Sequence, residues 1–244
     1  MLVQNTMLRS FLFVLPSFPK KKILFGYASI SILRNHPLIT QYNHIYIVSS
    51  NYCLDNNSEK IKVFDLKGNK IKEINNSYND NTYFIDSSYD YKSSNNFIIT
   101  ANRDYVASYD YTNNTIYNKY QEKANKDHNS IIINDRNEII ELIESSEDGY
   151  IRIWDFHLGI LLKKYLVGSS LYGLCLWNNE YLLIGAKDKT IKLLDLQKGK
   201  LVKSLSDGNS SVIAIKKIIL PQYGECLISQ GNGYNNIILW ANMK

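Results

Sequence analysis

The sequence has 244 residues, of which 45% are hydrophobic and 21% charged. This balance excludes an intrinsically disordered chain, which would be less hydrophobic and more highly charged, and the length suits one large all-β domain. The formal net charge is +5, but the lysines are scattered and the one tight run is Lys20 to Lys22, which argues against a nucleic-acid-binding surface.

The first predicted element is an apolar run over residues 8–18. It is shorter than the roughly 20 residues that a membrane-spanning helix needs, and Pro19 with three lysines follows it instead of a small-residue cleavage site. The three cysteines show no CxxC spacing and no paired histidines near them, so neither a disulfide framework nor a zinc site is predicted. We expect an intracellular protein, in the cytoplasm or alternatively in the nucleus, with no membrane insertion and no cofactor.

One strand pattern recurs along the rest of the chain. Its best copies are residues 148–155 (DGYIRIWD) and 188–195 (DKTIKLLD), and shorter copies lie at 61–65, 106–110 and 237–240. Equivalent positions are spaced about 40 to 45 residues apart, which is the period of a propeller blade. The bulky residues at the end of this strand are Phe64, Tyr109, Trp154, Leu194 and Trp240.

Each repeat contains four β-rich runs separated by turn residues. In the fourth repeat these runs are residues 171–177, 181–184, 190–194 and 200–205, and no helix is predicted anywhere. The recurring strand carries apolar residues on both of its faces, so we expect neighbouring sheets to cover both faces. The sequence therefore predicts an all-β propeller of about five four-stranded blades.

The recurring residues resemble the WD40 repeat, whose signature is a His at the head of a unit, an Asp in a tight turn and a closing Trp-Asp. The third repeat carries this signature in His128, Asp148, Trp154 and Asp155. In the family, these residues and a second-strand hydroxyl form a buried hydrogen-bonded chain with a structural role, and Ser145 or Ser146 would supply the hydroxyl here. The resemblance assigns related structural positions to Phe64, Asp65, Asp188, Asp195 and Trp240.

The resemblance also bears on how the ring would close. The fifth repeat ends without an outermost strand, and in WD40 propellers an N-terminal segment often supplies it; residues 8–15 are the candidate here. One domain over residues 1–244 would then hold the whole propeller. The alternative is a fragment of a larger WD-repeat subunit, or an open arc whose exposed edges favour oligomers. The expected repeat units are residues 22–76, 77–122, 123–167, 168–207 and 208–244.

The resemblance implies a non-catalytic protein-interaction scaffold whose partners are other proteins or peptides. The residues that precede the turn positions, Asn102, Glu147 and Lys187, would form a partner-facing rim of mixed charge. The alternative function is that of a five-bladed glycoside hydrolase, which needs two carboxylates at a defined separation. Asp86 and Asp135 are the candidates for that pair, although isolated aspartates at strand ends commonly form turns.

Overall fold

A computed structural model shows the fold as β-strands joined by turns. It describes residues 30–32, 47–50, 60–64, 69–75, 82–90, 93, 95–122, 126–136, 139–206, 210–232 and 237–241. Every element within these ranges is a strand, as the sequence predicts. In this part of the chain we find no helix that is long and apolar enough to cross a membrane.

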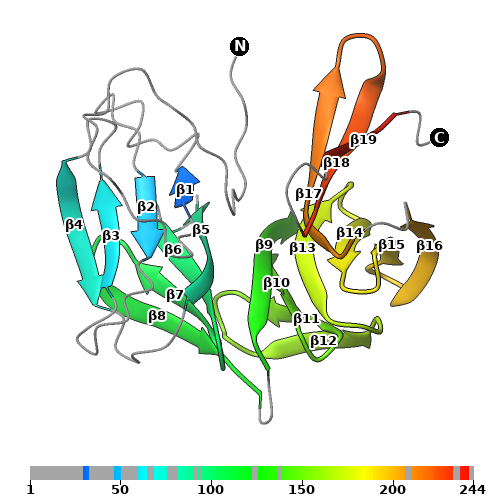
Figure 1. The fold of residues 1–244 in the computed structure, drawn as a ribbon. Helices are drawn as coiled ribbons and strands as arrows, with labels where there is room; N and C mark the ends of the chain where they lie inside the picture. Colours follow the sequence, from blue (N-terminus) through cyan, green and yellow to red (C-terminus); the bar gives the residue numbers. More distant parts are fainter. Residues whose placement is uncertain are drawn as a thin grey trace. The chain divides into compact units, whose positions relative to one another are not determined.

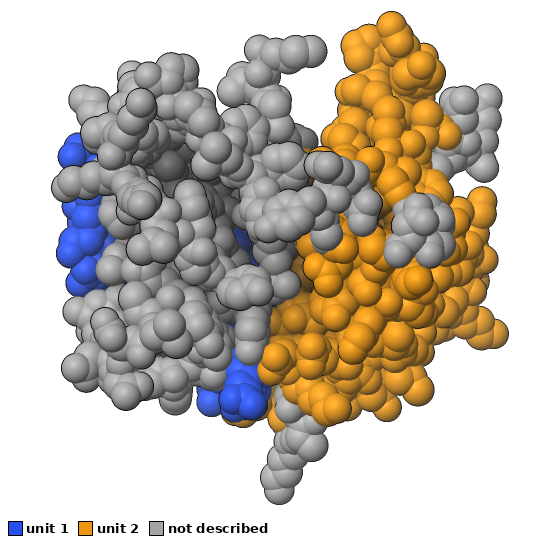
Figure 2. Space-filling model, in the orientation of Figure 1, with its two compact units in different colours: residues 1–119 blue, residues 120–244 orange. Residues whose placement is uncertain are grey.

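The contacts divide the chain into two units, Met1–Lys119 and Tyr120–Lys244, which Figure 2 colours separately. The first unit contains two antiparallel sheets of four strands, each in chain order. The strands of the first sheet are β1 (Ile30–Ile32), β2 (Ile47–Ser50), β3 (Lys60–Phe64) and β4 (Lys70–Asn75). The strands of the second sheet are β5 (Thr82–Asp90), β6 (Asn95–Asn102), β7 (Val106–Asp110) and β8 (Thr115–Tyr120), whose last residue is counted with the second unit.

The second unit contains three sheets, again built from consecutive strands (Figure 1). The third sheet has β9 (His128–Arg136), β10 (Ile139–Ser146), β11 (Tyr150–Asp155) and β12 (Leu161–Leu166). The fourth has β13 (Leu171–Leu176), β14 (Tyr181–Ala186), β15 (Thr190–Asp195) and β16 (Lys200–Ser206). The fifth has β17 (Val212–Leu220), β18 (Gly224–Gly231) and β19 (Ile237–Trp240), and its β17–β18 hairpin extends past β19.

The strand count corrects one part of the prediction. The described strands make four complete four-stranded blades, whereas the fifth sheet has three strands, so five full blades are not confirmed. The proposed closing strand at residues 8–15 lies outside the described residues, as does Asp65. For Phe64 only the backbone is described, at the end of β3.

Sheet-on-sheet packing explains why the repeated strand is apolar on both faces. Along β14, the side chains of Leu182 and Ile184 join a buried cluster with the third sheet, while that of Leu183 joins a cluster with the fifth. Successive residues of a strand point to opposite faces, so the fourth sheet is covered on both sides. In the first unit, Val63 and Tyr109 belong to one cluster that joins the first two sheets. The expectation that neighbouring sheets cover both faces is confirmed for the fourth sheet.

Two glycines let the fourth and fifth sheets approach closely. A Cβ atom at Gly185 would lie 2.5 Å from the carbonyl oxygen of Val212, and one at Gly173 would lie 2.8 Å from the Cα atom of Ala214. Real Cβ atoms do not come this near to backbone atoms, so these positions need glycine for packing.

Candidate functional site

The closing tryptophans define a fixed register in the third and fifth sheets. Trp154 pairs with Leu142, and Trp240 pairs with Leu227. In the fifth sheet the residue two positions beyond Leu227 is Ser229, and Trp240 Nε1 donates a hydrogen bond of 2.8 Å to its hydroxyl oxygen. This is the tryptophan–hydroxyl contact that the sequence predicts for the third sheet.

In the third sheet the equivalent register position holds Glu144, which faces Arg152 across the hairpin. Among the described residues, the predicted hydroxyl contact with Trp154 is therefore not found, although the Ser146 hydroxyl does interact with the turn residue Asp148, as the predicted chain implies. The Ser145 hydroxyl donates to the carbonyl of Tyr172 at 2.5 Å, and the Ser146 hydroxyl donates to that of Lys126 at 3.1 Å. Within the described residues, the buried Nε1 of Trp154 has no hydrogen-bond partner.

The hydroxyl contact in the fifth sheet gives a first testable prediction. Replacing Ser229 by alanine should lower the free energy of unfolding by about 1 kcal/mol, because the indole N–H of Trp240 loses its acceptor. Urea denaturation measures this loss. The matched test repeats Ser229→Ala in a Trp240→Phe background, where the substitution should cost clearly less. Equal costs in the two backgrounds would show that the hydrogen bond contributes nothing.

His128 begins β9 and is fully buried against Glu144. Its Nδ1 atom is hydrogen-bonded to Glu144 Oε2, and both side chains are inaccessible to solvent. The other carboxylate oxygen of Glu144 lies 3.7 Å from Nε of Arg152. His128 thus contacts the carboxylate of Glu144, a residue that is not part of the predicted chain.

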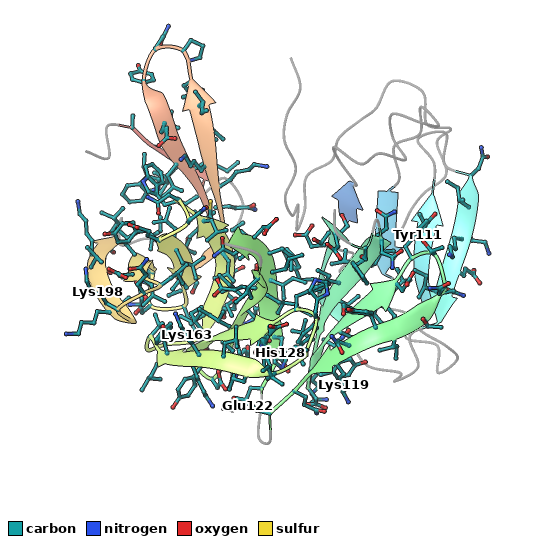
Figure 3. The ribbon with its side chains drawn as sticks, turned by 180° about the vertical axis from the view of Figure 1, so that it is seen from behind. Tyr111, Lys119, Glu122, His128, Lys163 and Lys198 are labelled. Atoms are coloured by element: carbon teal, nitrogen blue, oxygen red, sulfur yellow. The ribbon has the colours of Figure 1, made fainter. Side chains whose placement is uncertain are left out.

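Arg152 is the centre of a larger ionic network and is 1% exposed. Its guanidinium group forms a hydrogen-bonded ion pair with Asp148. Its Nε atom lies 2.6 Å from an oxygen of Glu122, and Lys164 reaches the same oxygen at 2.7 Å. Figure 3 shows Glu122 and His128, the two labelled members of this network. A buried arginine requires such partners, because an unpaired charge is very costly away from water.

The network changes the acidity of its members. Burial raises the pKa of Asp148 and of Glu122, but hydrogen bonds and charge attraction from Arg152 outweigh this, so both pKa values lie below normal. Burial likewise lowers the pKa of Arg152, and the hydrogen bonds from Asp148 and Glu122 reverse that effect and raise it. Both carboxyl groups and the guanidinium group are therefore charged at neutral pH.

The fourth sheet contains a smaller version of this ion pair. Asp188 in the turn pairs with Lys192 four residues later, at 2.7 Å, as Asp148 pairs with Arg152. The pKa of Asp188 is lowered because the hydrogen bond from Lys192 outweighs the effect of burial. The sequence signal for this pairing is a basic residue four positions after the turn Asp in both copies.

The aspartates that close the recurring strand cap the turns that follow it. Oδ1 of Asp155 accepts the backbone N–H groups of His157 and Leu158, at 2.9 and 2.8 Å. Oδ1 of Asp195 accepts those of Gln197 and Lys198, both at 2.9 Å. Aspartate is well suited to this position because its short side chain reaches backbone donors two and three residues ahead.

The predicted rim is exposed at two of its three positions. Glu147 and Lys187 are exposed and directly follow β10 and β14. Asn102 is buried, and its amide donates to the hydroxyl of Thr100 at 3.0 Å, so it is not a rim residue. Four residues separate the paired Ala101 and Val106, whereas five separate the paired Ser145 and Ile151, and this difference in register gives Asn102 the strand position held by Ser146.

The next two residues are Asp86 and Asp135, the candidate carboxylates of the glycoside hydrolase hypothesis. Asp86 lies within β5 and accepts a hydrogen bond of 2.8 Å from the N–H of Ser87. Asp135 is exposed near the end of β9. They belong to different units. Among the described residues, no group of three His, Cys, Asp or Glu side chains could hold a metal ion.

Comparisons with known proteins support the assignment of the fold. No protein-family model matches the sequence, and no curated protein matches it. The WD40 β-propeller domain of Doa1 is similar in structure, with a TM-score of 0.63 and 16% sequence identity, over 82% of this chain and 61% of that chain. This chain therefore spans less than two thirds of the Doa1 structure. At this identity the likeness shows the fold alone.

Proposed function

We propose that this chain, which has the WD40-type β-propeller fold, is a non-catalytic scaffold that binds other proteins or peptides. The observation that supports this most directly is that the clustered ionisable side chains of the third sheet contact one another. His128, Glu144, Arg152 and Asp148 are all engaged with one another inside the third sheet. Their role is to stabilise the sheet, which leaves the exposed loops and edges of a rigid frame for recognition.

The rim turns of the second unit are the proposed contact points. Glu147 and Lys187 occupy equivalent positions in neighbouring sheets, and the preceding loops fix both turns. The N–H of Glu147 donates to the carbonyl of Asp127 and that of Lys187 to the carbonyl of Ser170, both at 2.9 Å. Exposed charges of opposite sign on fixed turns can orient a partner without large binding energies. The described thiols of Cys175 and Cys226 are free, in keeping with a reducing intracellular compartment.

Affinity purification with quantitative mass spectrometry from the native cell tests this function. We expect at least one partner that co-purifies specifically and reproducibly with the full chain. Glu147→Lys combined with Lys187→Glu should lower its recovery several-fold, because the substitutions reverse both rim charges and keep the net charge.

The matched control reverses a charge away from the rim, at Glu180 in the β13–β14 turn, where Glu180→Lys should leave recovery unchanged. Loss of the partner with Glu180→Lys as well would contradict the rim assignment. The absence of any specific partner would contradict the scaffold function itself.

A further inference from the structure

We infer that the outer edge of β19 binds an extended segment of a partner protein, which adds an antiparallel fourth strand to the fifth sheet. The segment carries, in succession, an apolar residue, a lysine, any residue and a second apolar residue. The inference rests on the proposed function, because it gives the scaffold a second contact surface and specifies the chemistry of the segment that binds there.

β19 occupies the place of a third strand in its sheet. Trp240 pairs with Leu227 of β18, as Trp154 pairs with Leu142 in the third sheet. In the four complete sheets a fourth strand lies beside the third strand. Among the described residues of the fifth sheet, β19 is the last strand, so one of its edges has no strand paired to it (Figure 1).

The apolar side chains of β19 are half exposed at positions that are buried in a complete sheet. Ile237 is 51% exposed and Leu239 is 47% exposed. Their register equivalents in the third sheet, Ile151 and Ile153, are 0% and 1% exposed, and both pair with the fourth strand of that sheet. The fifth sheet therefore keeps exposed apolar surface that an added strand would help to cover.

β19 also lacks the features that protect the outer strands of other sheets. β4, β12 and β16 each contain lysine and a β-bulge. Lysines and bulges on an edge strand hinder its pairing with other chains. β19 reads Ile-Ile-Leu-Trp, and its four pairs with β18 follow one another without a bulge. An uncharged, regular edge of this kind readily accepts a further strand.

The fourth strands of the first, third and fourth sheets indicate which residues such a segment needs. Each places a lysine opposite the equivalent of Leu239 and an apolar residue opposite the equivalent of Ile237. In each, the pairing register also passes over an apolar residue immediately before that lysine. The three segments are residues 71–74 (IKEI), 162–165 (LKKY) and 202–205 (VKSL).

The surroundings of these positions explain their residue types. Lys163 and Lys203 are exposed, so the lysine position faces solvent. The second apolar residue is Ile74, Tyr165 or Leu205, and each packs against a buried apolar cluster. On β19 this second apolar residue would lie opposite Ile237. A charged residue in its place would bring an unpaired charge against apolar surface, which is unfavourable.

The exposure of the edge assigns the segment to another protein. Ile237 and Leu239 are half exposed in the structure of the full chain. Pairing of β19 with the β19 of a second copy would not supply the lysine that the other sheets place opposite this position, since β19 contains none. A partner segment that carries the order apolar–Lys–x–apolar satisfies both observations.

Fluorescence anisotropy with a labelled peptide of residues 199–206 (GKLVKSLS) tests the inference on the full chain. This peptide has the required order, and we expect saturable binding. The same peptide with Leu205→Asp should bind about tenfold more weakly or worse, because a carboxylate would face Ile237. Ile237→Lys with Leu239→Lys in the chain should weaken binding of the original peptide about as much, because lysines on an edge hinder strand pairing.

Backbone methylation distinguishes strand pairing from simple apolar contact. Two further peptides carry a methyl group on the amide nitrogen of Lys203 or on that of Ser204. Alternate residues of an added strand direct their N–H groups toward the sheet, so one peptide should lose about tenfold or more in affinity and the other should keep it. Equal affinities would overturn the inference. This measurement needs no substitution in the chain and so does not depend on the folding of a variant.

Ile219→Lys with Tyr223→Lys is the matched control. It makes the same charge change at exposed apolar residues of the β17–β18 hairpin, beyond β19, and should leave the affinity unchanged. An equal loss in this control would overturn the inference. So would a peptide that does not bind, which is the result expected if a segment of this chain already occupies the edge.

Sedimentation velocity on the chain alone tests the remaining occupant. We expect no dimer that depends on β19. A dimer that Ile237→Lys with Leu239→Lys dissociates would make a second copy the occupant and would overturn the inference. None of these outcomes affects the scaffold function, because the recovery of a cellular partner and its dependence on the rim charges test that function separately.

Discussion

Arg152→Met is expected to lower the free energy of unfolding by roughly 3 to 5 kcal/mol, the usual cost of removing one member of a buried ion pair. The guanidinium group is buried and contacts Glu122, Asp148 and Glu144. Methionine keeps most of the apolar volume, so the loss comes from carboxylates that are left without their cation. Urea denaturation at neutral pH measures it.

The fourth sheet supplies the matched control. Lys192 and Asp188 have the same spacing and nearly the same geometry, but the carboxylate of Asp188 is 37% exposed. Water can replace the lost partner there, so Lys192→Met should cost about 1 kcal/mol or less. Equal losses for Arg152→Met and Lys192→Met would show that burial of the network has no energetic consequence.

The pH dependence of stability gives an independent measurement on the same variants. The folded-state pKa values of Asp148 and Glu122 are lowered, so the stability they contribute is fully present above their unfolded values of about 4. That stability is lost as the pH falls from about 4 through the folded-state pKa values. The wild-type chain should therefore lose stability over this acid range, and Arg152→Met should lose less. A variant with an unchanged acid profile would contradict the assigned cause of the lowered pKa values.

The sequence predicted the repeated elements because they depend on local pattern. The alternation along residues 190–194 and the turn residues on either side place β15, and the apolar residues on both faces indicate coverage by neighbouring sheets. Trp154 is buried as the WD40 resemblance implies. Each of these features follows from strand periodicity, which a single sequence displays directly.

The hydrogen-bond and ion-pair partners of the polar residues depend on the pairing register of the strands, which cannot be read from the sequence. Glu144, and not a serine, reaches the position that faces His128 and Arg152, because β10 and β11 pair Leu142 with Trp154. A change of one residue in a hairpin connection moves every side chain to the other face of a strand. The burial of Asn102 has the same origin, since one residue fewer lies between the last paired residues of β6 and β7 than between those of β10 and β11. The contact of Glu122 with Arg152 joins residues 30 positions apart and has no local signal.

Gly149→Ala is expected to lower the free energy of unfolding about as much as Arg152→Met does, but for a steric reason. Gly149 has a φ of 81°, and a Cβ atom there would lie 1.9 Å from the carbonyl oxygen of Gly168. The same turn is held to that segment by hydrogen bonds from the N–H groups of Val167 and Gly168 to the carbonyl of Gly149, at 2.9 and 3.3 Å. The added methyl group must therefore separate the turn at Gly149 from the backbone at Gly168, although these two segments are hydrogen-bonded to each other.

Gly224→Ala isolates the steric part of this effect. Gly224 has a φ of 69°, close to that of Gly149, but no atom lies within 4 Å of its added Cβ position. Its replacement should cost only the left-handed backbone strain of about 1 to 2 kcal/mol. Gly149→Ala should exceed this by about 2 kcal/mol or more in thermal or urea unfolding, since the displaced turn also carries Asp148 and with it one contact of Arg152. Equal losses in the free energy of unfolding for the two variants would contradict this prediction. They would mean that the backbone around Gly149 shifts to accommodate the methyl group while the third and fourth sheets stay connected.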